Sequence, residues 1–419
     1  MIGLRANLFF VALGLSFLGL VMVYSATYRE FGTHFLLQRC GHVALGAAAF
    51  FLASRVRYTA WRTYAPGLYL AMLAGLILVL IPGVGQEVGG ARRWLDIGPL
   101  SLQPGEFAKL AAVVVLGCAV ARVPPGSGLP LKPLGAVGLL FALVLVEPDF
   151  GTSVVLLAGA AGVLWASELR TRDLVLSAVA TFVALLGVMW LAPYRRERFM
   201  TFLDPWPVAD GSGYQVVQSM VAIKAGGFFG SGAGAGAQGI AVPELDTDMI
   251  FALIGEELGF VGCALVLGLF GMLAVAGMRV ATRNIDPWIR MVAATLTVWL
   301  VAQAAINICY VVGLLPVTGI TLPLISSGGT SVVTTMLVFG VLANCARHEP
   351  EAVAALRSQG PGRFGRLMRL PAPEPYQPPV RRKPVRPPAT QRGSTGRAAG
   401  RSTVRGRPPA PRRRLGGRS

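Results

Sequence analysis

The chain has 419 residues, of which 54% are hydrophobic and only 14% charged, and its mean hydropathy is +0.60. A soluble domain cannot bury so much apolar surface, so these values exclude a cytosolic globular enzyme, a disulfide-stapled secreted domain and a disordered protein. The net charge of +18 lies mostly at the end of the chain, where residues 351–419 hold 17 Lys/Arg and 2 Asp/Glu. We therefore expect an apolar membrane domain over residues 1–347 and a basic, Pro/Arg-rich, disordered cytoplasmic tail over residues 348–419.

Apolar runs long enough to cross a bilayer recur along the membrane domain. There are ten of them, at about 8–26, 38–54, 65–82, 105–121, 134–147, 152–166, 174–192, 258–277, 291–314 and 329–345. The sequence predicts an all-α polytopic membrane protein with ten transmembrane helices. Lys and Arg gather in alternate short loops, which indicates that both termini are cytoplasmic. Residues 193–257 then form a large extracytoplasmic loop between the seventh and eighth spans.

Several basic residues fall on the predicted outer side, against the usual charge bias, and so need another explanation. They are Arg92, Arg93, Lys109, Arg195, Arg196, Arg198 and Lys224. They either bind an anionic group, such as a lipid diphosphate, or form salt bridges with loop carboxylates. Position alone leaves both readings open.

The long loop combines a glycine-rich run with an acidic cluster. The run over 226–236 favours a flexible hinge over a phosphate loop, because it lacks the Lys-Ser/Thr ending. Asp248 precedes the eighth span and is either a general base or a helix cap. Glu256 and Glu257 lie farther along, where an unpaired charge is costly, so we expect pairing with loop arginines or Lys109.

Other polar residues mark the same side of the membrane. Glu106 and Lys109 share one helix face, as a local ion pair or as a patch facing a cavity. Asp149 interrupts two spans and is expected to cap the second one. Ser326 and Gly328 belong to a small-polar turn that either presents N–H groups to an anionic head group or only begins a helix. The five Cys and three His show no metal-ligand or disulfide spacing, and no nucleic-acid module or organic cofactor is expected.

Taken in series, these segments resemble the SEDS family of bacterial cell-wall proteins, the group of FtsW, RodA and SpoVE. The resemblance covers residues 8–347. The matching stretches are Gly90–Trp94, Gln103–Lys109, Glu147–Thr152, Tyr194–Phe202, Asp204–Trp206, Gly211–Ser219, Thr247–Gly259, Gln303–Asn307 and Gly313–Ser331. The chain departs from the family at Gly105, where Ser is usual, and at Ser327, where Tyr is usual.

The resemblance implies an inverting peptidoglycan glycosyltransferase that polymerises lipid II outside the membrane, with a class B penicillin-binding protein as partner. The family's essential Asp falls on Asp248, which would be the base. Arg92, Arg93, Lys109 and the Arg195–Arg198 group would then stabilise the leaving diphosphate, with a divalent cation, Mg²⁺ or Mn²⁺, as a further candidate.

Gly213–Gln215 with Gln218-Ser219 is closer to the FtsW branch, which predicts a role at the division septum with other division proteins. The alternatives are a RodA-like elongation polymerase, a lipid II flippase and a non-catalytic division scaffold. For the tail, the sequence favours anionic inner-leaflet lipid or a cytoplasmic protein over nucleic acid.

Overall fold

The computed structural model describes residues 4–88, 90–98, 100–124, 126–191, 193–237 and 241–360, together with Pro373. Residues 1–376 form one compact unit, and residues 377–419 lie outside the described part of the chain.

The unit is built from helices, with one small sheet. The first three helices are α1 (Leu4–Phe31), α2 (His34–Arg55) and α3 (Tyr58–Leu80). After the sheet come α4 (Pro104–Val120), α5 (Leu131–Val146), α6 (Phe150–Trp165) and α7 (Thr171–Leu191). The long loop holds α8 (Pro193–Leu203), a 3-10 turn at Trp206–Val208, α9 (Tyr214–Gly226) and α10 (Ile250–Glu257). The chain continues with α11 (Gly259–Arg283), α12 (Pro287–Val311), α13 (Gly329–Arg347) and α14 (Pro350–Gln359).

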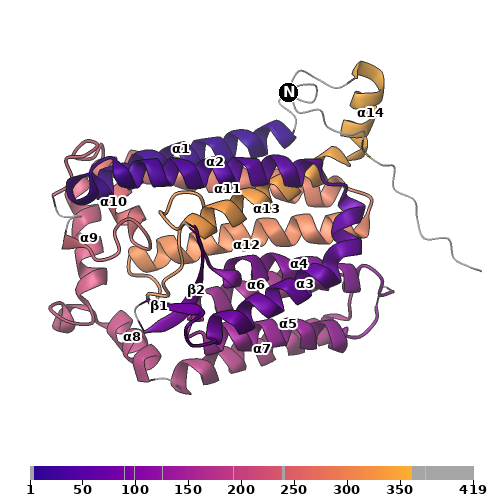
Figure 1. Cartoon of the computed structure of the whole chain (residues 1–419), viewed down its shortest axis with the longest axis horizontal. Coiled ribbons are helices and arrows are strands. Elements are labelled where there is room, and N and C mark those ends of the chain that lie inside the picture. The colour runs from indigo at the N-terminus through magenta and orange to yellow at the C-terminus, as the bar shows by residue number, and fades with distance from the viewer. Residues whose placement is uncertain are drawn as a thin grey trace, which may run out of the picture. The chain divides into compact units, whose positions relative to one another are not determined.

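Two helices late in the sequence form much of the core. Helix α12 contacts α4, α6 and α11, and it buries Trp288, Trp299 and Tyr310. Helix α13 packs along α2 and also contacts α1 (Figure 1). A methyl at Gly340 of α13 would stand 2.5 Å from the Phe50 carbonyl oxygen of α2, so glycine permits this close approach.

Seven helices in the described part of the chain are long and apolar enough to span a membrane, namely α1, α2, α3, α7, α11, α12 and α13. Helices α5 and α6 are shorter and apolar. Helix α4 has 17 residues and carries two buried charges. These ten helices fall on the ten predicted spans, so a multi-pass helical membrane domain is confirmed, whereas the count of ten crossings stays a prediction.

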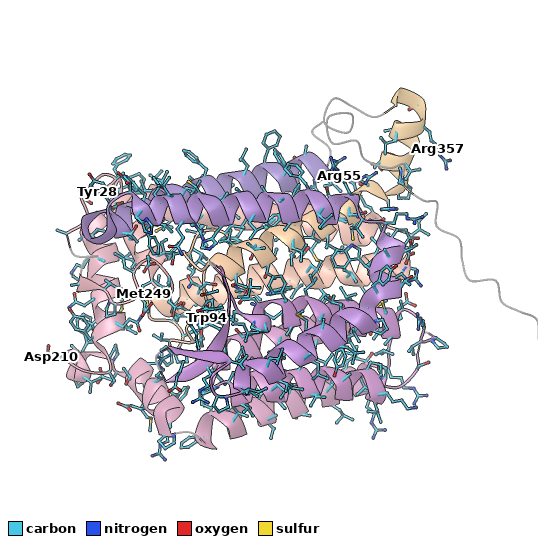
Figure 2. The ribbon with its side chains drawn as sticks, in the orientation of Figure 1. Tyr28, Arg55, Trp94, Asp210, Met249 and Arg357 are labelled. Atoms are coloured by element: carbon cyan, nitrogen blue, oxygen red, sulfur yellow. The ribbon has the colours of Figure 1, made fainter. Side chains whose placement is uncertain are left out.

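The two ends of the helices differ in what they carry. Helices α8, α9 and α10 and strands β1 (Gly85–Val88) and β2 (Ala91–Ile97) lie at one end, and α14 lies at the other, beside the start of α1 (Figure 1). Figure 2 shows the same separation, with Tyr28, Asp210 and Met249 at one end and Arg55 and Arg357 at the other. The loop and the start of the tail are thus on opposite sides, in agreement with the predicted topology.

The loop after α3 is not helical, which the all-α prediction missed. Strands β1 (Gly85–Val88), β2 (Ala91–Ile97) and β3 (Leu100–Leu102) form an antiparallel sheet in the order β1-β2-β3. Gly90 and Gly98 occupy the connecting turns with φ of +77° and +64°, values that glycine adopts without strain.

A helix continues past residue 348, where the sequence predicted the start of the tail. Helix α14 begins at Pro350, and Arg283 at the end of α11 forms ion pairs with Glu349 and Glu351 at 3.2 and 3.3 Å. Pro at the first helical turn and an early carboxylate favour a helix start, so ordered chain extends past 348.

Candidate active site

Asp248 lies just before α10, at the end of the helices that also carries α8 and α9. Met249 occupies the N-cap position of α10 and makes no side-chain capping bond, and Thr247 donates to Glu244. The capping alternative for Asp248 is therefore wrong. A methyl at Gly319, in the loop between α12 and α13, would stand 3.4 Å from Asp248 Oδ2. The carboxylate thus faces that loop.

Two side chains of α12 fix the backbone of Asp248. Asn307 Nδ2 donates to the Asp248 carbonyl oxygen at 2.8 Å, and the Tyr310 hydroxyl donates to it at 3.1 Å. Both groups also contact the Ile320 carbonyl oxygen, at 2.7 and 2.6 Å. Asn307 and Tyr310 are both buried, and together they hold the acidic loop against the 312–328 loop. The position of Asp248 is therefore fixed by α12.

The surroundings of Asp248 raise its pKa to about 7. Burial is the largest cause, and the negative charges of Glu244 and Asp149 add to it, while Arg198 and Arg93 oppose it. A carboxylate with this pKa can accept a proton near neutral pH and still exist in its charged form. The same charges show that Arg93, Asp149 and Arg198 belong to one electrostatic cluster with Asp248.

Asp149 makes two contacts, one within α6 and one with the start of α4. Its Oδ1 accepts from the Thr152 N–H at 2.9 Å, so it caps α6 as predicted. Its Oδ2 accepts from Gln103 Nε2 at 2.9 Å, which connects it to the start of α4. The cap thus fixes a carboxylate within the Asp248 cluster.

Arg93 reaches the break between α5 and α6 from strand β2. Its Nε donates to the Glu147 carbonyl oxygen at 3.2 Å and its Nη2 to the Pro148 carbonyl oxygen at 2.7 Å. Burial and the nearby Asp149 raise the pKa of Glu147 to about 8, so this carboxyl is mostly neutral at pH 7. A neutral Glu147 leaves the charge of Arg93 available for an anion.

Arg198 approaches from α8. Its Nη1 donates to the Val317 carbonyl oxygen at 3.3 Å, and it borders a cavity of about 220 Å³ with Thr201, Ser212 and Val317. The side chain of Arg195 lies outside the described part of the structure.

Glu106 and Lys109 form a buried ion pair of 2.7 Å on α4. Lys109 also lies 3.5 Å from Gln303 Oε1 and 5.2 Å from the ring centre of Trp299, both on α12. Gln303 in turn donates to the Thr321 carbonyl oxygen at 3.0 Å. The pair is therefore a local ion pair, and it is buried against α12.

Three predicted site residues are not brought to this cluster. Arg92 forms an exposed ion pair with Glu87 on the neighbouring strand, at 3.1 Å. This is the salt bridge to a loop carboxylate that the sequence left as one of two alternatives. Lys224 is exposed in the last turn of α9. Glu256 accepts from the Ala237 N–H at 2.8 Å and so stabilises the glycine-rich run.

The expected pairing of the α10 carboxylates with Lys109 was wrong. Lys109 pairs with Glu106, and Glu257 accepts from the Ser25 hydroxyl at 2.6 and 2.7 Å. The sequence did not predict the contact between Ser25 and Glu257, because Ser25 belongs to α1, far away along the chain. A single short polar residue in an apolar run does not indicate which residue it contacts.

The glycine-rich run packs closely against α10, which contradicts the hinge reading. A methyl at Gly226 would stand 1.9 Å from the Gly255 carbonyl oxygen, and one at Gly230 would stand 2.1 Å from that of Glu257. Ser231 and Gly232 also donate their N–H groups to α10 carbonyls, at 2.9 and 3.0 Å. Glycine is required here for close backbone approach.

The small-polar turn before α13 is ordered by Ser326, whose Oγ accepts from the Leu322 N–H at 2.7 Å. Gly328 is the N-cap of α13, where no side chain caps the first turn. The Ser327 N–H donates to the Asp246 carbonyl oxygen at 2.8 Å, so this turn lies against the acidic loop.

Sequence reasoning missed Gln103, Glu147, Asn307 and Tyr310 as site residues, although the first three fall in the matching stretches. A polar side chain inside an apolar span was the available signal. In the described part of the chain, no three His, Cys, Asp or Glu side chains are grouped to hold a metal ion.

The chain is similar to known proteins over most of its length. The model of the family described as "Cell cycle protein", FtsW/RodA/SpoVE, matches residues 5–351. "Probable peptidoglycan glycosyltransferase FtsW" of Mycobacterium tuberculosis is 41% identical over 387 residues, which is 88% of this chain and 72% of that protein. "Stage V sporulation protein E" of Bacillus subtilis is 36% identical over 343 residues, which is 79% of this chain and 93% of that protein.

Solved structures agree with this result. A chain of a peptidoglycan synthase complex, described as coordinating polymerization and crosslinking, superposes with a TM-score of 0.69 at 30% identity, covering 82% of this chain and 98% of that one. The rod shape determining protein RodA of Thermus thermophilus gives a TM-score of 0.62 at 28% identity, covering 81% and 96%. On the match over residues 5–351 and these identities, the chain belongs to the FtsW/RodA/SpoVE family.

Proposed function

We propose that this chain is a peptidoglycan glycosyltransferase that polymerises lipid II into glycan strands on the outer face of the cytoplasmic membrane, for septal wall synthesis in division. The single observation that supports it most is Asp248, a carboxylate with a pKa of about 7 at the outer end of the helices, with Arg93 and Arg198 near it. The similarity to proteins named FtsW supports the glycosyltransferase assignment and the septal role.

The reaction follows from this arrangement. Asp248 takes the proton of the acceptor GlcNAc 4-hydroxyl, and the oxygen attacks the anomeric carbon of the donor MurNAc. The bond from that carbon to the diphosphate breaks from the opposite face, so the anomeric configuration inverts. The bonding electrons leave with undecaprenyl diphosphate, and the proton stays on Asp248 until water removes it.

Fixed cations stabilise the charge that develops on the leaving group. Arg93 and Arg198 serve this purpose, and Lys109 acts from deeper in the helices through its contact with Gln303. A divalent cation is part of the proposal as an ion that arrives with the diphosphate and shares its charge.

The proposal includes partners and a location. A class B penicillin-binding protein crosslinks the product, since a relative of similar fold is part of a peptidoglycan synthase complex. Lipid II, membrane lipids and other division proteins complete the set, and the protein works in the cytoplasmic membrane at the septum.

The test is purified protein, with and without its class B partner, supplied with lipid II and scored for glycan chains. Asp248→Asn should reduce polymer at least 100-fold, because the general base is lost. Asp210→Asn is the matched control, since Asp210 is an exposed carboxylate of the same loop, well away from Met249 in Figure 2. Polymer made by Asp248→Asn at the parent rate would refute the assignment. Lipid II translocation without polymer in the parent protein would indicate a flippase instead.

A further inference from the structure

A second polar cavity reaches the turn before α13, whose Ser327 N–H donates to the Asp246 carbonyl oxygen of the acidic loop. It measures about 160 Å³ and is lined by Phe35, Gln38, Arg39, His42, Trp94, Ser101, Ser327 and Gly329. Its walls come from α2, from the β2–β3 sheet and from the start of α13. Ser327 and Gly329 belong to the small-polar turn considered above, and the other lining residues are not in the proposed diphosphate-binding set.

Arg39 is the unusual member of this wall. Its side chain is only 1% exposed, and its Nη2 donates to the carbonyl oxygens of Leu324 and Ile325, at 3.0 and 3.2 Å. The Nε and Nη1 atoms have no hydrogen-bond partner in the described part of the chain. A guanidinium group has five N–H donors. Burying the donors on Nε and Nη1 without acceptors costs free energy of folding.

The helix beside Arg39 adds donors of the same sign. Helix α13 is 19 residues long, and its N-cap Gly328 supplies no side-chain acceptor to the first turn. The first N–H groups of a helix carry partial positive charge and suit phosphate oxygens. The ring of His42 lies against this turn, because a methyl at Gly329 would stand 2.6 Å from its Nε2.

A carboxylate nearby does not remove this excess of positive charge. Asp246 attracts Arg39 electrostatically, but the two form no ion pair within 4 Å in the described part of the chain. The cavity of about 160 Å³ is well above the roughly 10–15 Å³ that one water needs, so it admits a group larger than one water.

We propose that this cavity binds the phosphate or diphosphate group of a lipid at the outer face of the cytoplasmic membrane, through Arg39 and the N-terminus of α13. The Arg fork and the helix N-terminus together match tetrahedral phosphate oxygens. Ser327 lines the cavity and also contacts the acidic loop that carries Asp248. The natural occupant is therefore the diphosphate of a lipid-linked sugar. Only this assignment of the occupant rests on the proposed function.

The experiment measures binding without turnover. Full-length protein in zwitterionic nanodiscs is titrated with farnesyl diphosphate, with inorganic diphosphate, and separately transferred to nanodiscs that contain phosphatidylglycerol. The readout is the thermal unfolding midpoint, which rises when a ligand binds only the folded state. We expect a saturable rise with both diphosphates.

Two variants examine the site. Arg39→Gln should weaken farnesyl diphosphate about tenfold or more, because charge-assisted hydrogen bonds are lost. Ser327→Asp leaves Arg39 in place and supplies an internal anion, so it should weaken farnesyl diphosphate to a similar extent, and it serves if Arg39→Gln does not fold. Arg172→Gln, which removes an exposed cation at the start of α7, is the matched control and should keep the full response.

The outcomes separate the sources of phosphate. A response to diphosphates supports the lipid-linked sugar, and a response confined to phosphatidylglycerol supports a phospholipid head group in the same cavity. Asp248→Asn should keep the diphosphate response even if polymerisation fails, so the two proposals fail independently. An unchanged response in both Arg39→Gln and Ser327→Asp, or no response to any probe in the parent protein, would overturn the inference and leave the cavity to water.

Discussion

Removing the charge of Glu244 should move the acid limb of the polymerisation rate to lower pH. Glu244 is exposed and raises the pKa of Asp248, so its neutral replacement lets the base lose its proton more easily. Thr247 Oγ1 donates to Glu244 Oε2 at 2.9 Å, and the side-chain oxygen of Gln can accept the same hydrogen bond. The substitution therefore changes charge with little change in contacts.

The magnitude follows from the pKa of Asp248, about 7 against an ordinary 3.8, a rise of about three units or about 4 kcal/mol. An exposed neighbour is screened by water, so we assign Glu244 about half a unit, less than the 1–3 units of a close pair. At pH 6 the ionised fraction of Asp248 then rises from about 9% to about 24%, a gain of about 2.6-fold. At pH 8.5 the fraction exceeds about 95% in both proteins, and the rates should agree.

The assay is kcat/KM for lipid II between pH 5.5 and 9, because this parameter reports the free enzyme. Arg198→Gln should move the acid limb the opposite way, since Arg198 lowers the pKa of Asp248. Asp210→Asn should leave the midpoint in place. An acid limb that stays fixed in Glu244→Gln, or moves upward, would show that Asp248 does not control the pH dependence.

Three further substitutions examine packing around the site. Lys109→Met should cost about 3–5 kcal/mol, because it leaves Glu106 buried without a partner, and the unfolding midpoint should recover in Glu106→Gln/Lys109→Met. Gly230→Ala should lower the yield of folded protein, since φ is +81° and the methyl meets a carbonyl oxygen at 2.1 Å, whereas Gly268→Ala, with open space around it, should fold normally. Tyr310→Phe should lower kcat about tenfold with KM little changed, because it loses the hydroxyl bonds to the backbone of the proposed base and of Ile320.

These three predictions have distinct contrary results. A double variant no more stable than Lys109→Met would show that the ion pair is not the source of the loss. Equal yields for the two glycine variants would contradict the close approach of the loop to α10. An unchanged kcat in Tyr310→Phe would mean that Asn307 alone positions Asp248.

The sequence by itself determined the helical membrane architecture and the separation of the acidic loop from the start of the tail. Hydrophobic run length and charge bias are local properties, so they survive without tertiary information. The Glu106–Lys109 pair and the Asp149 cap were equally accessible, because both partners lie within one helical turn. The sequence did not predict the sheet at 85–102, because short strands between spans show only weak alternation of apolar and polar residues.

Only the tertiary structure decided which cations lie near Asp248. Arg93 and Arg198 are 155 and 50 residues away along the chain, and β2 and α8 bring them to the cluster, whereas Arg92 points its charge at Glu87. The same holds for Arg39, whose unpaired nitrogens become visible only when α2 packs against α13. Such contacts depend on how helices pack over long sequence separations, and that packing is a property of the whole core rather than of any segment.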